Sequence, residues 1–304
     1  MTLIDHVARY VALKRRLGYD YRTHAGILRQ YARFADGRGD SVVRTATVTE
    51  WASAAVSRHQ AARRLHFVHA FAVWMRAEDA RHEVPPRGLF GPHSNQRPPP
   101  DLITTQELRA LLAAALRLGP TGTISPLTWH YMLGLIASTG IRRCEAVALR
   151  LTDVTPHGLV IRESKFRKSR LVTLHPSTTE ALDAYLAIRR AQATPDDHLF
   201  VLDRGRVPGP DAVTRVFRKL TIQTGIRTGT RRPRVHDLRH RFATRSLEAL
   251  DATEDPTRHM LALATYLGHV DPVSTYWYLE ASPVLLRDIA EATERTFTAG
   301  GGHD

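Results

Sequence analysis

The first part of the chain alternates apolar and polar positions with the spacing of helices. Apolar residues that recur at i, i+3, i+4 and i+7 predict helices at about 2–17, 22–36 and 59–79. Between the last two of these, Thr47 and Glu50 have the spacing of a capping box and predict the start of another helix. Residues 1–84 are therefore expected to form a small, all-helical domain.

A proline-rich stretch, "VPPRGLFGPHSNQRPPPD" at 84–101, follows this domain. Proline and glycine at this density do not sustain a helix, so we interpret 85–101 as a linker. The linker would lead to a second domain at 102–297, and "TAGGGHD" at 298–304 is expected to be a flexible tail.

The second domain is predicted to be mainly helical with one β-hairpin. Thr104 and Glu107 form a capping box, Pro126 is expected at the first position of another helix, and Gly140 ends that helix. "GLVIRE" (158–163) and "RLVTLH" (170–175) alternate like paired antiparallel strands. Further helices are expected at about 177–191, 211–224, 236–250, 257–267 and 283–296.

The charge of the 304 residues indicates a polyanionic partner. The formal net charge is +13 and the isoelectric point is near 10.5, values typical of proteins that bind nucleic acid. The charge is uneven, with net +8 over residues 1–100, +12 over 142–245 and −7 over 246–304. Two basic regions suggest two surfaces that grip one polyanion, with the acidic segment facing elsewhere.

Composition also excludes several classes of protein. The single cysteine, Cys144, excludes an internal disulfide framework and a cysteine-built zinc site, and we expect it to be a small buried residue. No apolar run approaches the ~20 residues needed to cross a bilayer. The N-terminus "MTLIDHVARY" has no signal-peptide pattern, so we expect a cytoplasmic protein with no membrane partner.

Two motifs place an arginine one helical turn from another functional group. "TGIRRCEA" sets Arg142 and Glu145 three residues apart, where a new helix begins after a glycine. "HDLRH" at 236–240 sets His236 and Arg239 three residues apart, on the same face of a predicted helix.

Two further motifs add a lysine-rich loop and a tyrosine. "ESKFRKSR" at 163–170 lies at the tip of the predicted hairpin, and "LGHVDPVSTYWYLE" at 267–280 sets His269 nine residues before Tyr278. Guanidinium, imidazole, ammonium and phenol groups without a carboxylate cluster suit phosphoryl chemistry that needs no metal. A two-metal nuclease would require several aspartates or glutamates, so we expect no metal and no other cofactor.

Taken together and in this order, the motifs resemble the tyrosine recombinase (phage integrase) family, and the "STYWYL" ending is most similar to site-specific integrases of mobile elements. The resemblance spans nearly all of 102–290, and residues 1–85 resemble the helical core-binding (SAM-like) domain of the family. It implies a two-domain, C-shaped DNA clamp that is mainly α with a small antiparallel β-hairpin sheet. It also implies DNA strand cleavage and rejoining through a 3′-phosphotyrosyl intermediate.

The resemblance assigns a role to each motif residue. Arg142 and Arg239 would hold the scissile phosphate, and His236 and His269 would assist phosphate binding and proton transfer. Tyr278 would be the nucleophile. The remaining implied roles are a general acid, Lys165, and a supporting residue, Glu145.

Two of these assignments have neighbouring alternatives. Lys168 lies in the same hairpin tip as Lys165 and could serve as the acid instead. Tyr276 lies two residues from Tyr278, so on a helix only one of the two can face the arginines. The basic residues expected to contact the DNA backbone or grooves are Arg143, Arg162, Arg167, Lys168 and Arg170.

The resemblance further implies that the partner is double-stranded DNA. It also implies a homotetramer with two protomers on each DNA site, and accessory or partner recombinases are possible. Two other functions stay open at this stage. One is a type IB topoisomerase-like enzyme that relaxes DNA, and the other is a non-catalytic DNA-binding protein that retains the fold.

Overall fold

The computed structural model describes residues 1–91, 100–120, 122–162, 169–192, 196–250 and 255–268. The chain divides into two compact units, Met1–Arg97 and Pro98–Asp304, each with its own apolar core. Among the described residues, no helix has the length and apolar character needed to span a membrane.

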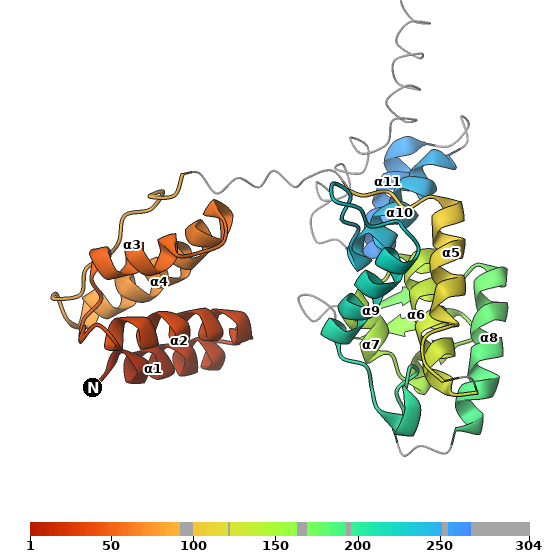
Figure 1. Ribbon diagram of the computed structural model, residues 1–304, viewed down its shortest axis with the longest axis horizontal. Helices are drawn as coiled ribbons and strands as arrows, with labels where there is room; N and C mark the ends of the chain where they lie inside the picture. The colour runs from red at the N-terminus through yellow and green to blue at the C-terminus, as the bar shows by residue number, and fades with distance from the viewer. Residues whose placement is uncertain (92–99, 121, 163–168, 193–195, 251–254, 269–304) are drawn as a thin grey trace, which may run out of the picture. The chain divides into compact units, whose positions relative to one another are not determined.

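The first unit is built from helices at the predicted positions (Figure 1). They are α1 (Leu3–Arg16), α2 (Arg22–Asp36), α3 (Thr45–Ser53) and α4 (Arg58–Glu78). Their apolar stripes meet in one core, whose largest fully buried side chains are Leu3, Leu28, Tyr31, Phe71 and Met75.

The start of α3 differs from the prediction. The helix begins two residues before Thr47, whose buried side chain donates a hydrogen bond to Asp40 over 2.5 Å instead of capping the helix. The backbone N–H of Thr45 is bound by the carboxylate of Glu83, 38 residues further along the chain, over 2.8 Å. A carboxylate that is distant in sequence therefore caps this helix in place of the predicted local capping box.

The second unit surrounds the apolar helix α6 (Ile124–Thr139), which packs against α5 (Thr105–Ala115), α8 (Pro176–Ala191) and α10 (Val235–Glu248). Two of the three local signals predicted at the ends of these helices are confirmed. Thr104 and Glu107 form the predicted capping box, and Gly140 ends α6 with φ +65°, whereas Pro126 is the third and not the first helical residue. The remaining helices of this unit are α7 (Arg143–Ala148), α9 (Pro210–Gln223) and α11 (Pro256–Leu267). Two short 3₁₀ turns, η1 (Leu151–Asp153) and η3 (Asp203–Gly205), lie between helices.

A small antiparallel sheet lies in the second unit and confirms the predicted hairpin. Strand β2 (Gly158–Ile161) pairs with β3 (Arg170–Val172), and Ile161 lies opposite Arg170. A two-residue strand that was not predicted, β1 (Val154–Thr155), pairs with the other edge of β2. The side chains of Leu159, Ile161 and Val172 are buried in the core of the unit, which fixes the register of the hairpin.

Candidate active site

Arg142 occupies the N-cap of α7, directly after the turn that ends α6. Its backbone N–H donates to Oε2 of Glu145 over 2.8 Å, and its side-chain Nη1 donates to Oε1 of the same carboxylate over 2.8 Å. Its Nη2 donates to the carbonyl oxygen of Gly268 over 3.0 Å. The side chain is 21% exposed, so the guanidinium is oriented by the protein while part of it remains accessible.

Glu145 is shared by two arginines. Nη1 and Nη2 of Arg170 donate to Oε1 and Oε2 of Glu145 over 3.0 and 2.8 Å, while Arg142 binds the same two oxygens. Burial raises the pKa of Glu145, but the hydrogen bonds from Arg170 and Arg142 outweigh it and bring the pKa to about 2. Glu145 is therefore ionised at neutral pH and fixes the position of both guanidinium groups.

Arg239 is the second arginine predicted to hold phosphate, and α10 carries it into the interior. The residue is 1% exposed. Its Nη1 donates to the carbonyl oxygen of Gly140 over 2.7 Å, and its Nη2 donates to that of Leu267 over 2.8 Å. These acceptors lie 99 residues before it and 28 residues after it in the chain, so the fold and not the local sequence orients this side chain.

The carbonyl groups that orient Arg142 and Arg239 belong to the C-terminal ends of two helices. Gly140 follows α6 with φ +65°, and Gly268 follows α11 with φ +68°, so both need a left-handed conformation. The unpaired carbonyls at a helix C-terminus carry partial negative charge and attract cations. Two helix ends thus preorganise the two arginines before any anion binds.

Arg142 and Arg239 line the same pocket, of about 380 Å³, together with His236. Its other lining residues include two more arginines, Arg143 and Arg234, and among the described residues that line it none is acidic. Such a pocket favours a group with concentrated negative charge, and bidentate guanidinium groups match the oxygens of a phosphate.

The two histidines of the "HDLRH" motif differ in exposure. His236 is exposed and lines the pocket, whereas His240 is 4% exposed. Their rings meet edge to face, with centroids 4.4 Å apart. Burial raises the pKa of Asp237, which accepts a hydrogen bond from the backbone N–H of Arg234 over 2.6 Å and so caps α10.

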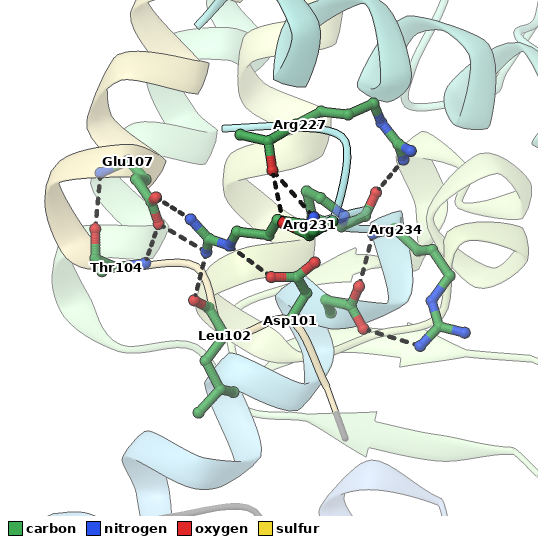
Figure 2. Close-up of polar contacts among 11 residues, drawn as sticks. Asp101, Leu102, Thr104, Glu107, Arg227, Arg231 and Arg234 are labelled. Atoms are coloured by element: carbon green, nitrogen blue, oxygen red, sulfur yellow. Dashed lines mark hydrogen bonds and ion pairs between the residues drawn. The ribbon is translucent and has the colours of Figure 1, made fainter. Parts of the chain in front are cut away.

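The loop before α10 is fastened to the beginning of the second unit by Arg231 (Figure 2). Its Nε donates to Asp101 over 2.5 Å, its Nη2 donates to the carbonyl oxygen of Leu102 over 2.8 Å, and both Nη atoms bind the carboxylate of Glu107. Within the loop, Arg227 donates to the carbonyl oxygen of Pro233 over 2.6 Å. These contacts fix the residues that lead directly into His236 and Arg239.

The three described arginines that were predicted to contact DNA have different surroundings. Arg143 is exposed and its Nη1 donates to the hydroxyl of Thr214, whereas Arg162 is largely exposed and forms an ion pair with buried Asp153. The side chain of Arg170, which was expected to contact DNA, is only 11% exposed and is bound to Glu145. The reason is that β3 directs this side chain into the site.

Two further residues near the site are Cys144 and Tyr266. The prediction that Cys144 is buried is wrong, because it is exposed and lines the arginine pocket in the first turn of α7. Tyr266 is stacked on Phe242 with ring centroids 5.5 Å apart, and its hydroxyl donates to the carbonyl oxygen of Thr173 over 3.0 Å. Burial raises the pKa of Tyr266 to about 12, so it is not a readily ionised nucleophile.

Several predicted site residues lie outside the described part of the chain. They are the lysines and arginine of the hairpin tip and the C-terminal histidine and tyrosines, namely Lys165, Arg167, Lys168, His269, Tyr276 and Tyr278. The described chain stops at Gly268, one residue before the predicted His269.

Sequence reasoning missed the groups that orient the arginines. Three are backbone carbonyls, of Gly140, Leu267 and Gly268, which no side-chain motif reveals. The contact of Arg170 with Glu145 was also missed, since Arg170 was expected to contact DNA.

Comparison with known proteins identifies relatives along most of the chain. The phage integrase family matches residues 101–283, more than half of the chain. The chain is 36% identical over 310 residues to the putative integrase/recombinase y4rB of Sinorhizobium fredii, with coverage of 97% of this chain and 98% of that protein.

Solved structures with low sequence identity share the fold. The Tn1549 transposon integrase in complex with transposon right-end DNA aligns with a TM-score of 0.67 at 15% identity, over 96% of this chain and 99% of that one. A lambda integrase tetramer bound to a Holliday junction aligns with a TM-score of 0.68 at 16% identity, over 91% and 77% of the two chains. The match over residues 101–283 and the similarity to y4rB along nearly its whole length establish that the chain belongs to the phage integrase family, the tyrosine recombinases.

Proposed function

We propose that this protein is a site-specific DNA recombinase that cleaves and rejoins DNA strands without a metal or nucleotide cofactor. One observation carries the proposal: Arg142 and Arg239, from opposite ends of a 97-residue interval, line one pocket with His236. Preorganised guanidinium groups stabilise the charge that develops on phosphate oxygens during transfer at phosphorus. Family membership supplies the reaction to which this pocket is fitted.

The reaction exchanges one phosphate ester for another and then reverses. The hydroxyl oxygen of Tyr278 would give up its proton to one of the two motif histidines, His236 or His269, and form a bond to the scissile phosphorus while the bond from phosphorus to the 5′ oxygen breaks. The departing 5′ oxygen would take a proton from Lys165, or from Lys168 in its place. A 5′-hydroxyl from the partner strand would then attack the phosphotyrosine, release Tyr278 and restore the DNA backbone.

The other motif residues would serve the same phosphate. Arg142 and Arg239 would bind its non-bridging oxygens, with Glu145 holding Arg142 in place. His236, on the pocket wall, and His269, beyond the described chain, would donate hydrogen bonds or move protons.

We further propose that both units hold the DNA. The net charges of +8 over residues 1–100 and +12 over 142–245 are suited to the duplex backbone, and phosphate contacts make such binding strongly dependent on salt. In this proposal 1–84 is the core-binding domain, 85–101 the linker and 102–297 the catalytic domain of a C-shaped clamp. The enzyme would act in the compartment that holds its DNA, the cytoplasm.

A tetramer of two protomers on each of two DNA sites would carry out the exchange, with the acidic C-terminal segment as one contact between subunits. The lambda integrase neighbour was solved as a tetramer on a Holliday junction, which supports this arrangement. Deleting residues 283–304 should abolish tetramers on DNA while binding to a single site persists. Tetramers that form normally without these residues would exclude the segment from the contact.

Strand exchange distinguishes recombination from relaxation. Two duplexes of different length that carry the site from the ends of the element encoding the protein should yield joined strands of recombinant length. Relaxation of a supercoiled plasmid without such products would indicate a topoisomerase-like activity. Binding to the site with neither product would indicate a non-catalytic DNA-binding protein.

A further inference from the structure

Arg170 makes three side-chain hydrogen bonds within the described site, yet it has no place in the chemistry above. It begins β3, on the chain that returns from the hairpin tip containing Lys165 and Lys168. Its side chain is 11% exposed, compared with 21% for Arg142, which lines the pocket. Arg170 itself is absent from the described lining of that pocket.

The guanidinium of Arg170 reaches two elements that lie far apart in the sequence. Its Nη1 and Nη2 bind both carboxylate oxygens of Glu145 in α7, 25 residues earlier. Its Nε donates to the carbonyl oxygen of Tyr266, 96 residues later, in the last turn of α11. One side chain therefore joins β3, α7 and the C-terminal end of α11.

Arg170 also packs against the turn that leaves α11. A Cβ atom added to Gly268 would lie 3.0 Å from Nη1 and 3.1 Å from Cζ of Arg170, so the guanidinium occupies the space that a side chain would fill. The carbonyl oxygen of the same glycine accepts a hydrogen bond from Arg142. Gly268 precedes His269 in the sequence, so these contacts fix the point from which the last predicted motif departs.

We propose that Arg170 is a positioning residue that orients Arg142 through Glu145 and sets the α11 turn through Tyr266 and Gly268, and that it does not contact DNA. The inference rests on the proposed function, because the group it positions is the one that would bind the scissile phosphate. Since Glu145 presents both oxygens to both arginines, the loss of Arg170 lets the carboxylate and Arg142 rotate together. A misplacement of about 1 Å in such a group is enough to slow a reaction about 100-fold.

DNA affinity and cleavage rate separate a positioning role from a phosphate contact. Arg170→Gln and Arg170→Lys would be compared with wild type, with Arg143→Gln as the variant that removes an exposed pocket arginine and Arg190→Gln as a control on the exposed surface of α8. The measurements are the dissociation constant for the DNA site at several salt concentrations and the rate of covalent adduct formation at saturating DNA.

For Arg170→Gln we expect affinity within about twofold of wild type, an unchanged salt dependence and cleavage slowed about 100-fold. Arg170→Lys should recover part of the rate because it keeps a cation beside Glu145. In Arg143→Gln the salt dependence should decrease by about one counterion, as expected for a lost phosphate contact. A similar decrease in Arg170→Gln, with cleavage at saturation unchanged, would overturn the proposal and restore Arg170 as a DNA contact.

The titration of Glu145 supplies a readout that does not depend on catalysis. The charged groups that face this carboxylate in the described part of the site are Arg142 and Arg170. In wild type the carboxylate should remain ionised to about pH 3, whereas in Arg170→Gln it should titrate at higher pH and give cleavage an added decline in acid. Carboxyl chemical shifts of Glu145 followed by NMR would measure this change, and titration identical to wild type would contradict the coupling.

A double variant covers the case in which Arg170→Gln does not fold, because it removes both charges of the buried pair. Arg170→Gln combined with Glu145→Gln should cleave no more slowly than Glu145→Gln alone, since both residues act on Arg142 by one route. Independent, multiplicative losses would contradict that route. If wild type forms no adduct but the Glu145 titration shifts as expected, the recombinase proposal fails while the positioning of Glu145 by Arg170 stands.

Discussion

Arg239 donates a hydrogen bond from Nη1 to the carbonyl oxygen of Gly140 over 2.7 Å, across 99 residues of sequence. The contact joins the helix that carries the "HDLRH" motif to the turn from which Arg142 emerges. The two arginines are thus oriented by a shared framework: the turn after α6 receives Arg239, and the turn after α11 receives Arg142. In each case a backbone oxygen at the end of a helix accepts a hydrogen bond from the guanidinium and helps to fix its orientation.

Gly140 cannot be replaced by alanine without cost. Its φ is +65°, and an added Cβ would lie 2.6 Å from Cδ1 of Phe242. We expect Gly140→Ala to lower the free energy of unfolding of the second unit by about 2 kcal/mol or more, from backbone strain and the clash together.

Gly134, within α6, is the matched control. An added Cβ there would be 3.9 Å from Leu112, an ordinary contact, and alanine favours a helix interior over glycine by up to about 1 kcal/mol. Denaturant titration of both variants should therefore give shifts of opposite sign. A Gly140→Ala protein as stable as wild type would contradict the strained turn.

We expect that lysine cannot perform the role of Arg239. The guanidinium donates to the carbonyls of Gly140 and Leu267 and still lines the phosphate pocket, a geometry that the single ammonium of lysine cannot reproduce. We expect Arg239→Lys to slow cleavage by about 100-fold or more while DNA affinity changes little. Single-turnover cleavage at saturating DNA measures the rate, and cleavage within a few-fold of wild type would argue against a role in transition-state stabilisation.

Glu145 makes stability depend on pH in a defined direction. Its pKa falls from 4.5 to about 2 in the folded protein, so its contribution is fully present above about pH 4.5 and is lost as the pH falls towards 2. At neutral pH the shift corresponds to on the order of 3 kcal/mol. Unfolding free energies of wild type and Glu145→Gln should therefore converge between pH 4.5 and 2.5. A gap that stays constant over this range would mean that the carboxylate is not held as described.

Arg231 should stabilise the loop that leads into α10. Arg231 contacts Asp101, Leu102 and Glu107, and the side chains of its two ion pairs are 22–30% exposed. Because partly exposed ion pairs contribute modestly, we expect Arg231→Ala to lower the free energy of unfolding by about 1–2 kcal/mol. Amide hydrogen exchange should quicken in 227–234 and at the start of α5. The exposed neighbour Arg232 provides the control, since its replacement by alanine should leave both regions as protected as in wild type. Equal exchange in the two variants would show that the ion pairs do not hold the loop.

Local sequence signals predicted the elements well where the determining groups are neighbours in the chain. The Thr104–Glu107 capping box and the αL turn at Gly140 are decided within four residues, and both occur as expected. The capping box at Thr47 failed because a carboxylate 38 residues from Thr45 occupies that helix end. Local sequence patterns indicate where a helix can form and how neighbouring residues can cap it, but they carry no information about partners that are distant in sequence.

In the candidate site, too, local motifs were predictable and contacts between distant residues were not. Arg142, Glu145, His236 and Arg239 could be identified from the order and spacing of motifs, and the structure gathers the three basic residues around one pocket. The role of Arg170 could not be predicted, because a strand that begins with arginine looks the same whether its side chain faces DNA or a buried carboxylate. Only the pairing of Ile161 with Arg170 and the packing against Gly268 turn that side chain inward.

Covalent attachment to DNA tests the central claim most directly. A nicked suicide duplex that carries the end of the element would be incubated in EDTA with wild type, with Tyr278→Phe and with Tyr276→Phe, and adducts that survive SDS would be counted. We expect an adduct with wild type and with Tyr276→Phe, and none with Tyr278→Phe. An adduct that persists in Tyr278→Phe and disappears in Tyr276→Phe would move the nucleophile, and specific binding without any adduct would contradict tyrosine recombination.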